Sequence, residues 1–436
     1  MKENKILGWS IIFLLAIIPI LLLMTLGEET SWFGDYSSAT QTLGEIFGLV
    51  GMTLFALTFV LSTRIKAIED LFGGLDKVYI VHAIVGGAAL VSMLFHPIFL
   101  VLKFIPSDVW QAALYLLPGS YWSVNFGIIA LMGLIFLISL TLYSSMKYNR
   151  WKFSHEFLGL VFLFAVFHIF LVRGNASRDN IFVGYYEYAA AVSIIGLGAF
   201  SYSLFLKNRI FKTAVYRVRT IKPYKNAFEI SMVAEHKPLQ YKAGQFIFVR
   251  FYNRRLPREA HPFSIASETN SPILTIIVKK LGDFTSKLIE LREGDKVSIE
   301  GPYGKFDYTK AKGKNQVWIA GGIGIVPFLG MAKDLEDKTI DGTISLFYSV
   351  ADESDFIGYD LLTQLSSANK KFSFIAWNSK TQGYLDAKKI QEISGSVKDK
   401  AYFLCGPPGF KDSIIKGLLQ LGVKKQSIHE EAFDFR

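Results

Sequence analysis

The residues best suited to chemistry in the first half of the sequence are four histidines inside apolar segments. They form two sets along the chain, His82 with His96 and His155 with His168. Ionisable or metal-binding residues inside a membrane span are costly and therefore indicate function. Two imidazoles that face each other can bind an iron porphyrin from both sides, so the pattern predicts two bis-histidine haem sites.

Helix geometry predicts where these sites lie. The members of the two sets are 14 and 13 residues apart, on the order of 20 Å along a helix. The two helices run in the same direction, so His82 is expected to lie level with His155. His96 is then level with His168, near the opposite membrane face. A spacing of 13 residues does not return to the same helix face, which predicts tilt or an interruption near His155. Pro97 can bend the helix that carries His82 and His96.

Six apolar segments of about 20 residues are long enough to hold these histidines in a lipid bilayer. We expect membrane helices over six ranges: 6–26, 43–61, 79–102, 123–142, 157–172 and 185–206. The first resembles a signal peptide, but its long core without a clear cleavage site favours a retained helix. Lys and Arg collect at loops on alternate sides, which predicts that both termini are cytoplasmic.

The composition agrees with a chain of two regimes. Of the 436 residues 51% are hydrophobic and 19% are charged, and apolar runs dominate to about residue 206. The net charge of +10 does not predict nucleic-acid binding, because the basic residues flank apolar runs and lack interleaved aromatic side chains. A single cysteine, Cys405, excludes an internal disulfide and agrees with a reducing compartment.

The second half predicts two soluble domains. Short alternating stretches bounded by Pro, Gly and Asn are typical of a small barrel, and strands that alternate with helices are typical of a parallel sheet. We therefore expect a multidomain membrane protein with three parts. They are a six-helix transmembrane bundle over 1–210, an antiparallel β-barrel domain over 211–312 and an α/β parallel-sheet domain over 313–436.

Two motifs in the barrel region can hold a planar redox ring and its pyrophosphate. The first offers an aromatic wall, a hydroxyl and backbone amides, in the run His261, Pro262, Phe263, Ser264 and Ile265. In the second, Gly282 permits a close backbone approach and Thr285 offers a hydroxyl beside a helix N-terminus. Each alone is compatible with an ordinary strand or capped helix, but together they predict a flavin site.

Glycine turns after two strands of the α/β region predict a dinucleotide site. The first opens a helix and contains Gly321, Gly322, Gly324 and Pro327, where the backbone and the helix dipole can meet a pyrophosphate. The second contains Cys405 and Gly406, and a buried structural cysteine is the alternative interpretation of Cys405.

The choice of nucleotide is open. Asp352 and Glu353 follow the second strand without an Arg to receive a 2′-phosphate, which favours NADH. Lys380 or Lys411 can still supply a positive charge, so we expect both NADPH and NADH as donors.

These motifs resemble a known enzyme architecture. The span count, histidine order and spacing resemble the ferric-reductase-like transmembrane domain of NADPH oxidases and ferric-chelate reductases. The motifs at 261–265, 282–286 and 405–409 resemble the ferredoxin–NADP reductase superfamily. The resemblance is closest to the bacterial NADPH oxidases and implies FAD, two haem b groups and NADPH as cofactors.

The resemblance also implies roles for single residues. His82 and His155 would hold the inner haem, and His96 and His168 the outer haem. The candidates for haem-propionate partners are Arg64, Arg173 and Arg178, each with a boundary anchor as the alternative. Cys405 and Gly406 would lie near the nicotinamide. Phe433, with Phe435 as the alternative, would cover the flavin until the nicotinamide displaces it.

A flavin is chemically required because a hydride carries two electrons and haem iron takes one at a time. The resemblance therefore predicts an NAD(P)H oxidase of the cell membrane that reduces extracellular dioxygen to superoxide and needs no activating subunit. A transmembrane ferric-chelate reductase is the alternative, which the lack of a metal-ligand cluster in the outer loops disfavours. A transporter or sensor with a reductase module is a third reading, but it would need ionisable residues along a substrate pathway.

Overall fold

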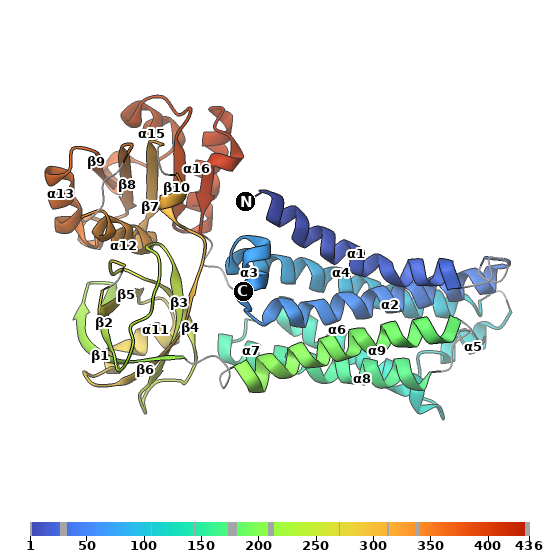
Figure 1. Cartoon of the computed structure of the whole chain (residues 1–436). Helices are drawn as coiled ribbons and strands as arrows, with labels where there is room; N and C mark the ends of the chain where they lie inside the picture. The colour runs from blue at the N-terminus through green and yellow to red at the C-terminus, as the bar shows by residue number, and fades with distance from the viewer. Residues whose placement is uncertain are drawn as a thin grey trace. The chain divides into compact units, whose positions relative to one another are not determined.

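The computed structural model describes residues 2–26, 33–105, 107–143, 145–172, 181–207, 213–269, 271–311, 314–336 and 341–431. The chain forms two compact units, Met1–Ile210 and Phe211–Arg436. The first consists of helices and the second contains two β-sheets with helices around one of them (Figure 1). The boundary between the two units follows residue 210, a few residues after the point near 206 where the long apolar runs end.

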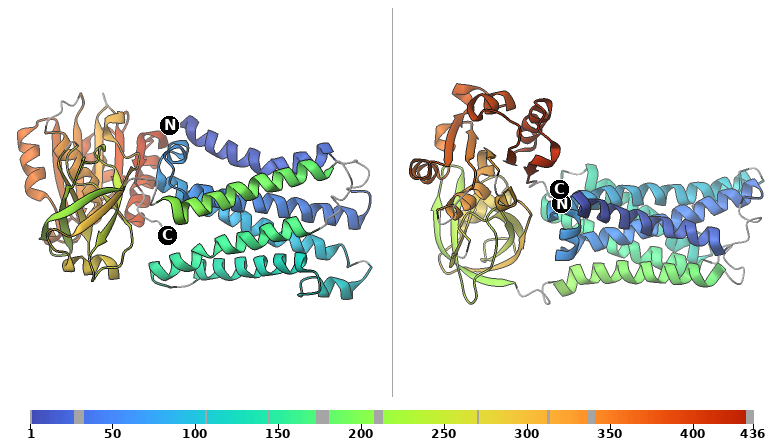
Figure 2. Two further views of the ribbon diagram at one scale, coloured as in Figure 1. Left: turned by 60° about the horizontal axis from the view of Figure 1, so that its bottom comes forward. Right: turned by 45° about the horizontal axis from the view of Figure 1, so that its top comes forward.

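Within the described residues, five helices are long and apolar enough to cross a membrane. They are α2 (Tyr36–Ser62), α4 (Leu75–Leu102), α6 (Trp122–Tyr143), the successive helices α7 (Tyr148–Glu156) and α8 (Leu158–Leu171), and α9 (Ile181–Ser201) with its π-helical end η3 (Tyr202–Leu206). Two further views show these helices running alongside one another (Figure 2). Helix α1 (Lys2–Leu26) has a shorter described apolar part, Ile6–Leu22, so the sixth span stays a prediction.

Two short helices, α3 (Lys66–Phe72) and α5 (Val109–Leu114), lie in the connections and were not predicted. Helix α2 begins where the Asp35 carboxylate accepts a hydrogen bond of 2.8 Å from the main-chain N–H of Ser38, an ordinary N-cap. Helix α3 ends at Gly73, whose φ of 81° suits glycine. Helices α3 and α5 have 7 and 6 residues, which is too short for hydrophobic periodicity to reveal them.

Glycines bring the membrane helices close together. Helix α2 packs along α4, and a Cβ added at Gly51 would lie 3.0 Å from the Met93 side chain of α4. On α8, a Cβ at Gly159 would lie 2.1 Å from the Phe200 ring of α9. Small residues at helix interfaces permit this close approach in membranes, so the bundle depends on glycine positions as well as on its apolar surface.

The barrel-like part of the second unit is a six-stranded antiparallel sheet in the order β4-β3-β6-β1-β2-β5. Its strands are β1 (Ala214–Pro223), β2 (Ala227–Ala234), β3 (Phe246–Tyr252), β4 (His261–Ser264), β5 (Ile273–Lys279) and β6 (Lys296–Tyr303). Alternate side chains such as Ile247, Val249 and Phe251 enter one apolar core, as the period of a strand requires. The short helix α11 (Asp283–Ser286) follows β5.

The last part is a five-stranded parallel sheet in the order β11-β10-β7-β8-β9. Its strands are β7 (Gln316–Gly321), β8 (Ile344–Val350), β9 (Phe372–Asn378), β10 (Ala401–Cys405) and β11 (Ile428–Glu430). The predicted antiparallel and parallel sheets are thus confirmed. The exact domain limits at 210 and 312 stay predictions.

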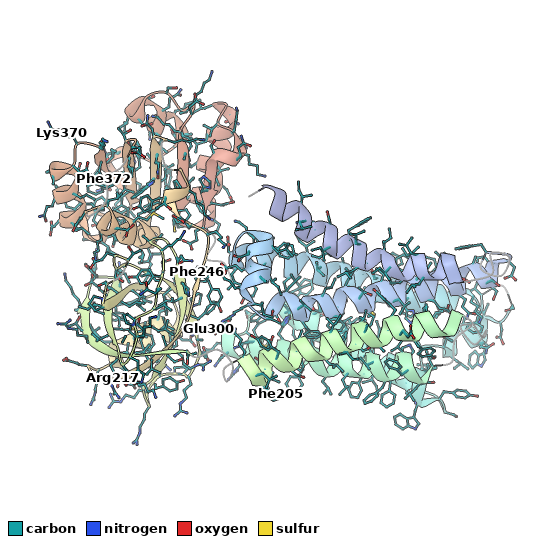
Figure 3. The ribbon with its side chains drawn as sticks, viewed as in Figure 1. Phe205, Arg217, Phe246, Glu300, Lys370 and Phe372 are labelled. Carbon is teal, nitrogen blue, oxygen red and sulfur yellow. The ribbon has the colours of Figure 1, made fainter. Side chains whose placement is uncertain are left out.

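Helices cover both faces of the parallel sheet. The core on one face includes α12 (Val326–Asp334) and α13 (Tyr359–Ala368), and the core on the other includes α15 (Ala387–Ser394) and α16 (Pro408–Gln420). Burial on both faces produces the near-continuous apolar strands seen in the sequence. At the start of β9 the ring of Phe372 is buried while Lys370, two residues earlier, is exposed (Figure 3).

Candidate redox sites

The four intramembrane histidines come together as two pairs. The ring centres of His82 on α4 and His155 near the end of α7 are 6.2 Å apart. Those of His96 on α4 and His168 on α8 are 6.1 Å apart. Two imidazoles that bind one metal from opposite sides, each with a nitrogen at about 2 Å, have ring centres on the order of 6 Å apart. Both pairs therefore have the spacing that an iron between them requires.

Each of the four rings is held from behind at Nδ1. Three partners are main-chain carbonyl oxygens and the fourth is a hydroxyl: Gly44 for His96 (2.7 Å), Ser123 for His168 (2.7 Å), Thr58 for His82 (3.0 Å) and Thr141 for His155 (3.2 Å). A carbonyl can only accept, so Nδ1 of the first three carries the proton. This tautomer leaves Nε2 available as the metal ligand.

The helix that carries His155 is interrupted close to this residue. Helix α7 ends at Glu156, Phe157 separates the two helices, and α8 begins at Leu158. The spacing of 13 residues between His155 and His168 predicted such a break, because a continuous helix would turn the two rings to different faces. The interruption lets both rings face α4.

A cavity of about 540 Å³ contains the outer pair, His96 and His168, in its lining. Most of the lining is apolar, and one part carries polar side chains. Lys103 Nζ donates to Gln41 Oε1 at 2.7 Å, and Gln41 Nε2 donates to Glu45 Oε1 at 3.0 Å. Facing imidazoles, an apolar lining and one cation fit a porphyrin with its carboxylates. The signal for this polar group was weak, because isolated polar residues at the ends of apolar segments are common.

Of the three arginines proposed as propionate partners, Arg64 lies within the described residues. Arg64 has a left-handed φ of 60° and its Nε donates to Tyr79 Oη at 2.7 Å. Tyr79 lies three residues before His82 on α4, so this contact is near the inner pair. A non-glycine residue held at positive φ is uncommon and is often found at functional sites. Arg173 and Arg178 lie outside the described residues.

The two flavin motifs meet on the barrel. The His261 ring at the start of β4 stacks on Phe284 of α11 with 3.8 Å between ring centres. The hydroxyl of Ser264 is buried and has no hydrogen-bond partner in the described part of the chain. A buried hydroxyl without a partner is expected where a ligand supplies the missing bond. Thr285 Oγ1 accepts from the main-chain N–H of Gly282 at 3.0 Å, which closes the turn against β4.

The other residues of the first flavin motif lie next to Ser264 in the sequence. Pro262 and Phe263 are partly buried, and Ile265 is fully buried and donates its N–H to Gln245 O at 3.0 Å. An aromatic side chain, a hydroxyl in need of a partner and a closed glycine turn are the groups that a flavin would need here. The residues present therefore fit FAD.

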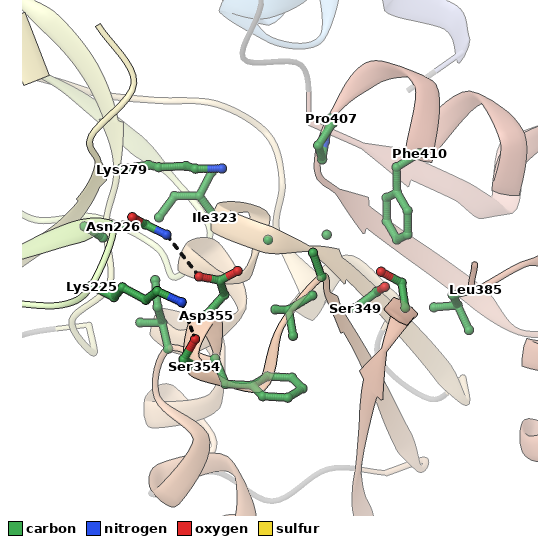
Figure 4. A pocket seen from close by; sticks show the side chains of 18 of the residues that line it. Lys225, Asn226, Lys279, Ile323, Ser349, Ser354, Asp355, Leu385, Pro407 and Phe410 are labelled. Atoms are coloured by element: carbon green, nitrogen blue, oxygen red, sulfur yellow. Dashed lines mark hydrogen bonds between the residues drawn. The ribbon is translucent and has the colours of Figure 1, made fainter. Parts of the chain in front are cut away.

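A second cavity of about 540 Å³ lies where the predicted nucleotide motifs come together. Gly321, Gly322, Pro407 and Gly409 line it from the α/β part, together with Phe410. The β1–β2 turn lines the opposite side. Lys225 Nζ donates to Ser354 Oγ at 2.6 Å, and Asn226 Nδ2 donates to Asp355 Oδ1 at 3.1 Å (Figure 4). These two links between the barrel and the α/β part were not predicted from the sequence.

The two glycine turns pack tightly on each other. A Cβ at Gly324 would lie 2.2 Å from Cys405 O, and one at Gly406 would lie 3.1 Å from the Gly321 backbone. Contacts below 3.0 Å to backbone force a shift of the chain. Pro327 is buried in the first turn of α12. These glycines are therefore needed for the meeting of the two turns, in addition to any role toward a ligand.

Cys405 is completely buried at the end of β10. Burial, and then the charge of Glu431, raises the pKa of the Cys405 thiol well above its ordinary value. The thiol is therefore protonated at neutral pH and unreactive as a nucleophile. Phe433 and Phe435 lie outside the described residues.

The acidic group after β8 is engaged by neighbours. Asp352 accepts from Ser354 Oγ at 2.6 Å and forms an ion pair of 3.0 Å with Lys380. The Ser354 hydroxyl, followed by Lys380, holds the pKa of Asp352 below its ordinary value. Lys411 is buried and donates to Glu430 Oε2 and to Glu431 O, at 3.3 and 2.8 Å. Of the two lysines considered for the nucleotide, Lys380 is thus the one beside the acidic group.

Comparison with protein families gives three matches in chain order. Residues 47–166 match the ferric reductase like transmembrane component, 210–307 match an FAD-binding domain, and 318–416 match an oxidoreductase NAD-binding domain. The chain is therefore a membrane flavoprotein with a nicotinamide-nucleotide-binding domain. More narrowly, it has the architecture shared by NADPH oxidases and ferric reductases, with a dehydrogenase part of the ferredoxin–NADP reductase type.

Single relatives cover about half of the chain. The phenol hydroxylase P5 protein of Acinetobacter pittii is 29% identical over 240 residues, which is 51% of this chain and 65% of that protein. The flavohemoprotein of Bacillus subtilis is 29% identical over 220 residues, 46% of this chain and 53% of that protein. The chain thus spans between about half and two thirds of the length of these relatives.

Two solved structures are similar to the chain at low identity. The FAD/NAD-binding domain of nitric oxide dioxygenase from Vibrio cholerae has a TM-score of 0.45 and 23% identity, and the match covers 50% of this chain and 98% of that chain. A ferredoxin NADP+ reductase from Neisseria gonorrhoeae has a TM-score of 0.44 and 20% identity, with 51% and 98% covered.

Proposed function

We propose that this membrane oxidoreductase is an NAD(P)H oxidase that delivers electrons through FAD and two b-type haems to dioxygen outside the cell, with superoxide as the product. The observation that carries the proposal is the pair of facing imidazoles at each of two levels, His82 with His155 and His96 with His168, at ring separations of 6.2 and 6.1 Å. Ionisable residues are expensive within a bilayer, and two matched pairs are best explained by bound iron.

In this proposal the inner haem is bound by His82 and His155, and the outer haem by His96 and His168. When bound, FAD would take a hydride and pass on single electrons, and the haems would carry these electrons across the bilayer. One hydride supplies two electrons, so each nucleotide oxidised would reduce two dioxygen molecules and release one proton. The chain itself holds the imidazoles in one tautomer and keeps the path within an apolar bundle.

The flavin would rest on His261, Pro262, Phe263, Ser264 and Ile265. The orphaned Ser264 hydroxyl would bond to the ring, and the turn at Gly282 and Thr285 would receive the pyrophosphate. The nucleotide would enter the cavity at Gly321, Gly322 and Gly324, ahead of Pro327. Cys405 and Gly406 would lie at the nicotinamide end, and Phe433 would cover the flavin.

Both nicotinamide nucleotides would serve as donors. The Asp352 carboxylate near the cavity suits the free 2′-hydroxyl of NADH, whereas its partner Lys380 can approach the 2′-phosphate of NADPH. We place the protein in the cell membrane of a bacterium as a multi-pass protein with cytoplasmic termini, active without a protein activator.

Ferric-chelate reduction is a second candidate, favoured by the match of residues 47–166 to the ferric reductase component. The cationic Lys103 at the outer cavity would attract an anionic chelate more strongly than neutral dioxygen. Lys103→Met should then lower the rate with an anionic ferric chelate several-fold more than the rate with dioxygen, because loss of a partner for the haem carboxylates would affect both acceptors alike, with Lys398→Met as the surface control. Equal effects on both acceptors would count against a chelate site.

The decisive experiment uses the purified full-length protein in lipid vesicles. Haem absorption in the Soret region, oxidation of NADPH and NADH, and reduction of a superoxide-dismutase-sensitive reporter are measured beside reduction of a ferric chelate. The proposal expects haem absorption and reporter reduction that superoxide dismutase suppresses. Protein that stays colourless after expression with ample haem would overturn it, and chelate reduction without superoxide would favour the second candidate.

A further inference from the structure

The two histidine pairs are held by different kinds of partner. In the outer pair both Nδ1 atoms lie 2.7 Å from a main-chain oxygen, that of Gly44 on α2 and that of Ser123 on α6. Four residues after each of these comes a glycine, and a Cβ at Gly48 or Gly127 would lie 2.7 Å from the histidine Nδ1. The lack of side chains at Gly48 and Gly127 therefore leaves room for the two rings to reach main-chain oxygens.

The inner pair lacks this symmetry. His82 Nδ1 meets a main-chain oxygen, that of Thr58, at 3.0 Å, whereas His155 Nδ1 meets the Thr141 hydroxyl at 3.2 Å. Thr141 Oγ1 also donates to Leu137 O, at 2.9 Å. A hydroxyl has one hydrogen, and here it is used toward Leu137. The oxygen of Thr141 therefore accepts from His155 Nδ1–H, which fixes the tautomer of His155 by a side chain.

His155 also has fewer constraints from its own helix. It lies next to the interruption at Phe157, and the ring of Trp151 stacks on it with 5.3 Å between centres. An imidazole beside a helix interruption needs an external partner to keep its orientation. Among the described residues, Thr141 is the hydrogen-bond partner of this ring, so orientation and ligand basicity at this position depend on one hydroxyl.

We propose that Thr141 is a positioning residue that orients His155 and lowers the reduction potential of the inner haem independently of the outer haem. The proposal rests on the haem binding put forward above. A partner for Nδ1–H makes the opposite nitrogen a stronger donor, which favours ferric over ferrous iron. Main-chain partners persist through any side-chain substitution, so the potential at this one ligand is adjustable by a single residue.

The test is a redox titration of the haem absorption of the full-length protein. Thr141→Val removes the hydroxyl at nearly constant shape, and Thr141→Ser keeps it. Thr40→Val is the matched control, because Thr40 Oγ1 also donates to a carbonyl four residues back, that of Tyr36 at 2.9 Å. We expect Thr141→Val to move one of two titration components to higher potential and leave the other in place, and the Ser and Thr40 variants to match the wild type.

Haem content and the low-spin electron paramagnetic resonance signal are measured on the same samples, with Thr141→Ala as a second variant. Loss of one haem in the Val or Ala protein, with both retained in the Ser protein, would also support a positioning role. Wild-type titration and haem content in both the Val and Ala proteins would overturn the proposal while leaving the proposed function intact. Wild-type protein without haem absorption would overturn both.

Discussion

The first unit, Met1–Ile210, is called the membrane unit below, and the second, Phe211–Arg436, the reductase unit. Their candidate sites use different chemical groups. In the membrane unit the reactive groups are the side chains of four histidines. The main chain of neighbouring helices holds His82, His96 and His168, and the Thr141 hydroxyl holds His155. In the reductase unit the site is largely main chain, because the turns at 321–324 and 405–409 meet backbone to backbone where Gly324 approaches Cys405 O and Gly406 approaches Gly321.

This difference follows from the two solvents. A polar side chain inside hydrocarbon is expensive and is therefore kept only where it works. At the ends of parallel strands, helix N-termini and backbone amides already favour anions, so glycines that expose them suffice. The membrane unit should consequently fail when one of these histidines is removed or displaced, and the reductase unit should fail when a side chain is added to its glycine turns.

The largest effect is expected from His168→Ala, which removes a proposed ligand of the outer haem. Delivery of electrons to an external acceptor should fall by more than the 10–100-fold that loss of an outer-shell partner costs. Reduction of a soluble dye by the flavin should continue, because no change is made in the reductase unit. Steady-state rates with both acceptors provide the measurement. His236→Ala, at an exposed position, is the control, and retained transmembrane activity in His168→Ala would refute the ligand assignment.

A slightly smaller loss is expected from Gly127→Ala, where a side chain is added in the membrane unit. Its Cβ would lie 2.7 Å from His168 Nδ1 and would push the ring from Ser123 O. Haem affinity should drop about 10–100-fold, as for loss of an outer-shell bond. The ratio of haem to protein reports this. Gly87→Ala has open space on α4 and should keep both haems, and equal haem content in the two variants would contradict the prediction.

In the reductase unit, Gly324→Ala should interfere with the proposed nucleotide site. The new Cβ would lie 2.2 Å from Cys405 O, and such overpacking costs about 1–3 kcal/mol. We expect a lower thermal transition of this unit and slower flavin reduction by NAD(P)H, followed by stopped-flow absorption. The haem absorption is the internal control, because the change lies in the other unit. Unchanged flavin reduction would show that the two turns can separate without consequence.

The smallest effect concerns the donor preference. Asp352→Asn should raise the ratio of NADPH to NADH turnover by about 10-fold at most, because a carboxylate that repels the 2′-phosphate is lost and Lys380 is released. Asp360→Asn, an exposed acid on α13, should leave the ratio unchanged. A ratio that stays at the wild-type value in Asp352→Asn would place the 2′-position elsewhere.

The Asp352 carboxylate also predicts how the donor preference depends on pH. Hydrogen bonds from Ser354, followed by the ion pair with Lys380, hold the pKa of Asp352 below its ordinary value. The carboxylate is therefore ionised from weakly acid to alkaline pH. The wild-type donor ratio should be flat from roughly pH 6 to 8 on this account, since an ordinary Asp titrates near 4. A step in the ratio within that window would point to another titrating group.

Sequence patterns revealed the parts of these sites that depend on residue type. Histidine spacing predicted which rings meet, and the 13-residue spacing predicted an irregular helix near His155. The partners of the rings were not predictable in this way. Gly127 and Thr141 lie on α6. Their relation to His168 and His155 exists only once α6 packs against α8 and α7, respectively.

Other gaps have physical causes too. The polar chain from Lys103 to Glu45 joins the ends of two helices that are far apart in sequence. The links from Lys225 and Asn226 join exposed polar residues whose pairing leaves no periodic signal. The sixth span over 6–26 and the aromatic cover at Phe433 stay predictions.

The hydrogen bonds of Lys225 and Asn226 determine how firmly one side of the proposed nucleotide cavity is held. The turn at Lys225 and Asn226 makes two hydrogen bonds across this cavity, and both bonds are exposed to water. Exposed bonds of this kind contribute roughly 0.5–1.5 kcal/mol each, little more than thermal energy. Both bonds join the turn between β1 and β2 to the segment after β8, so breaking them would separate this side of the cavity without parting any strand of either sheet.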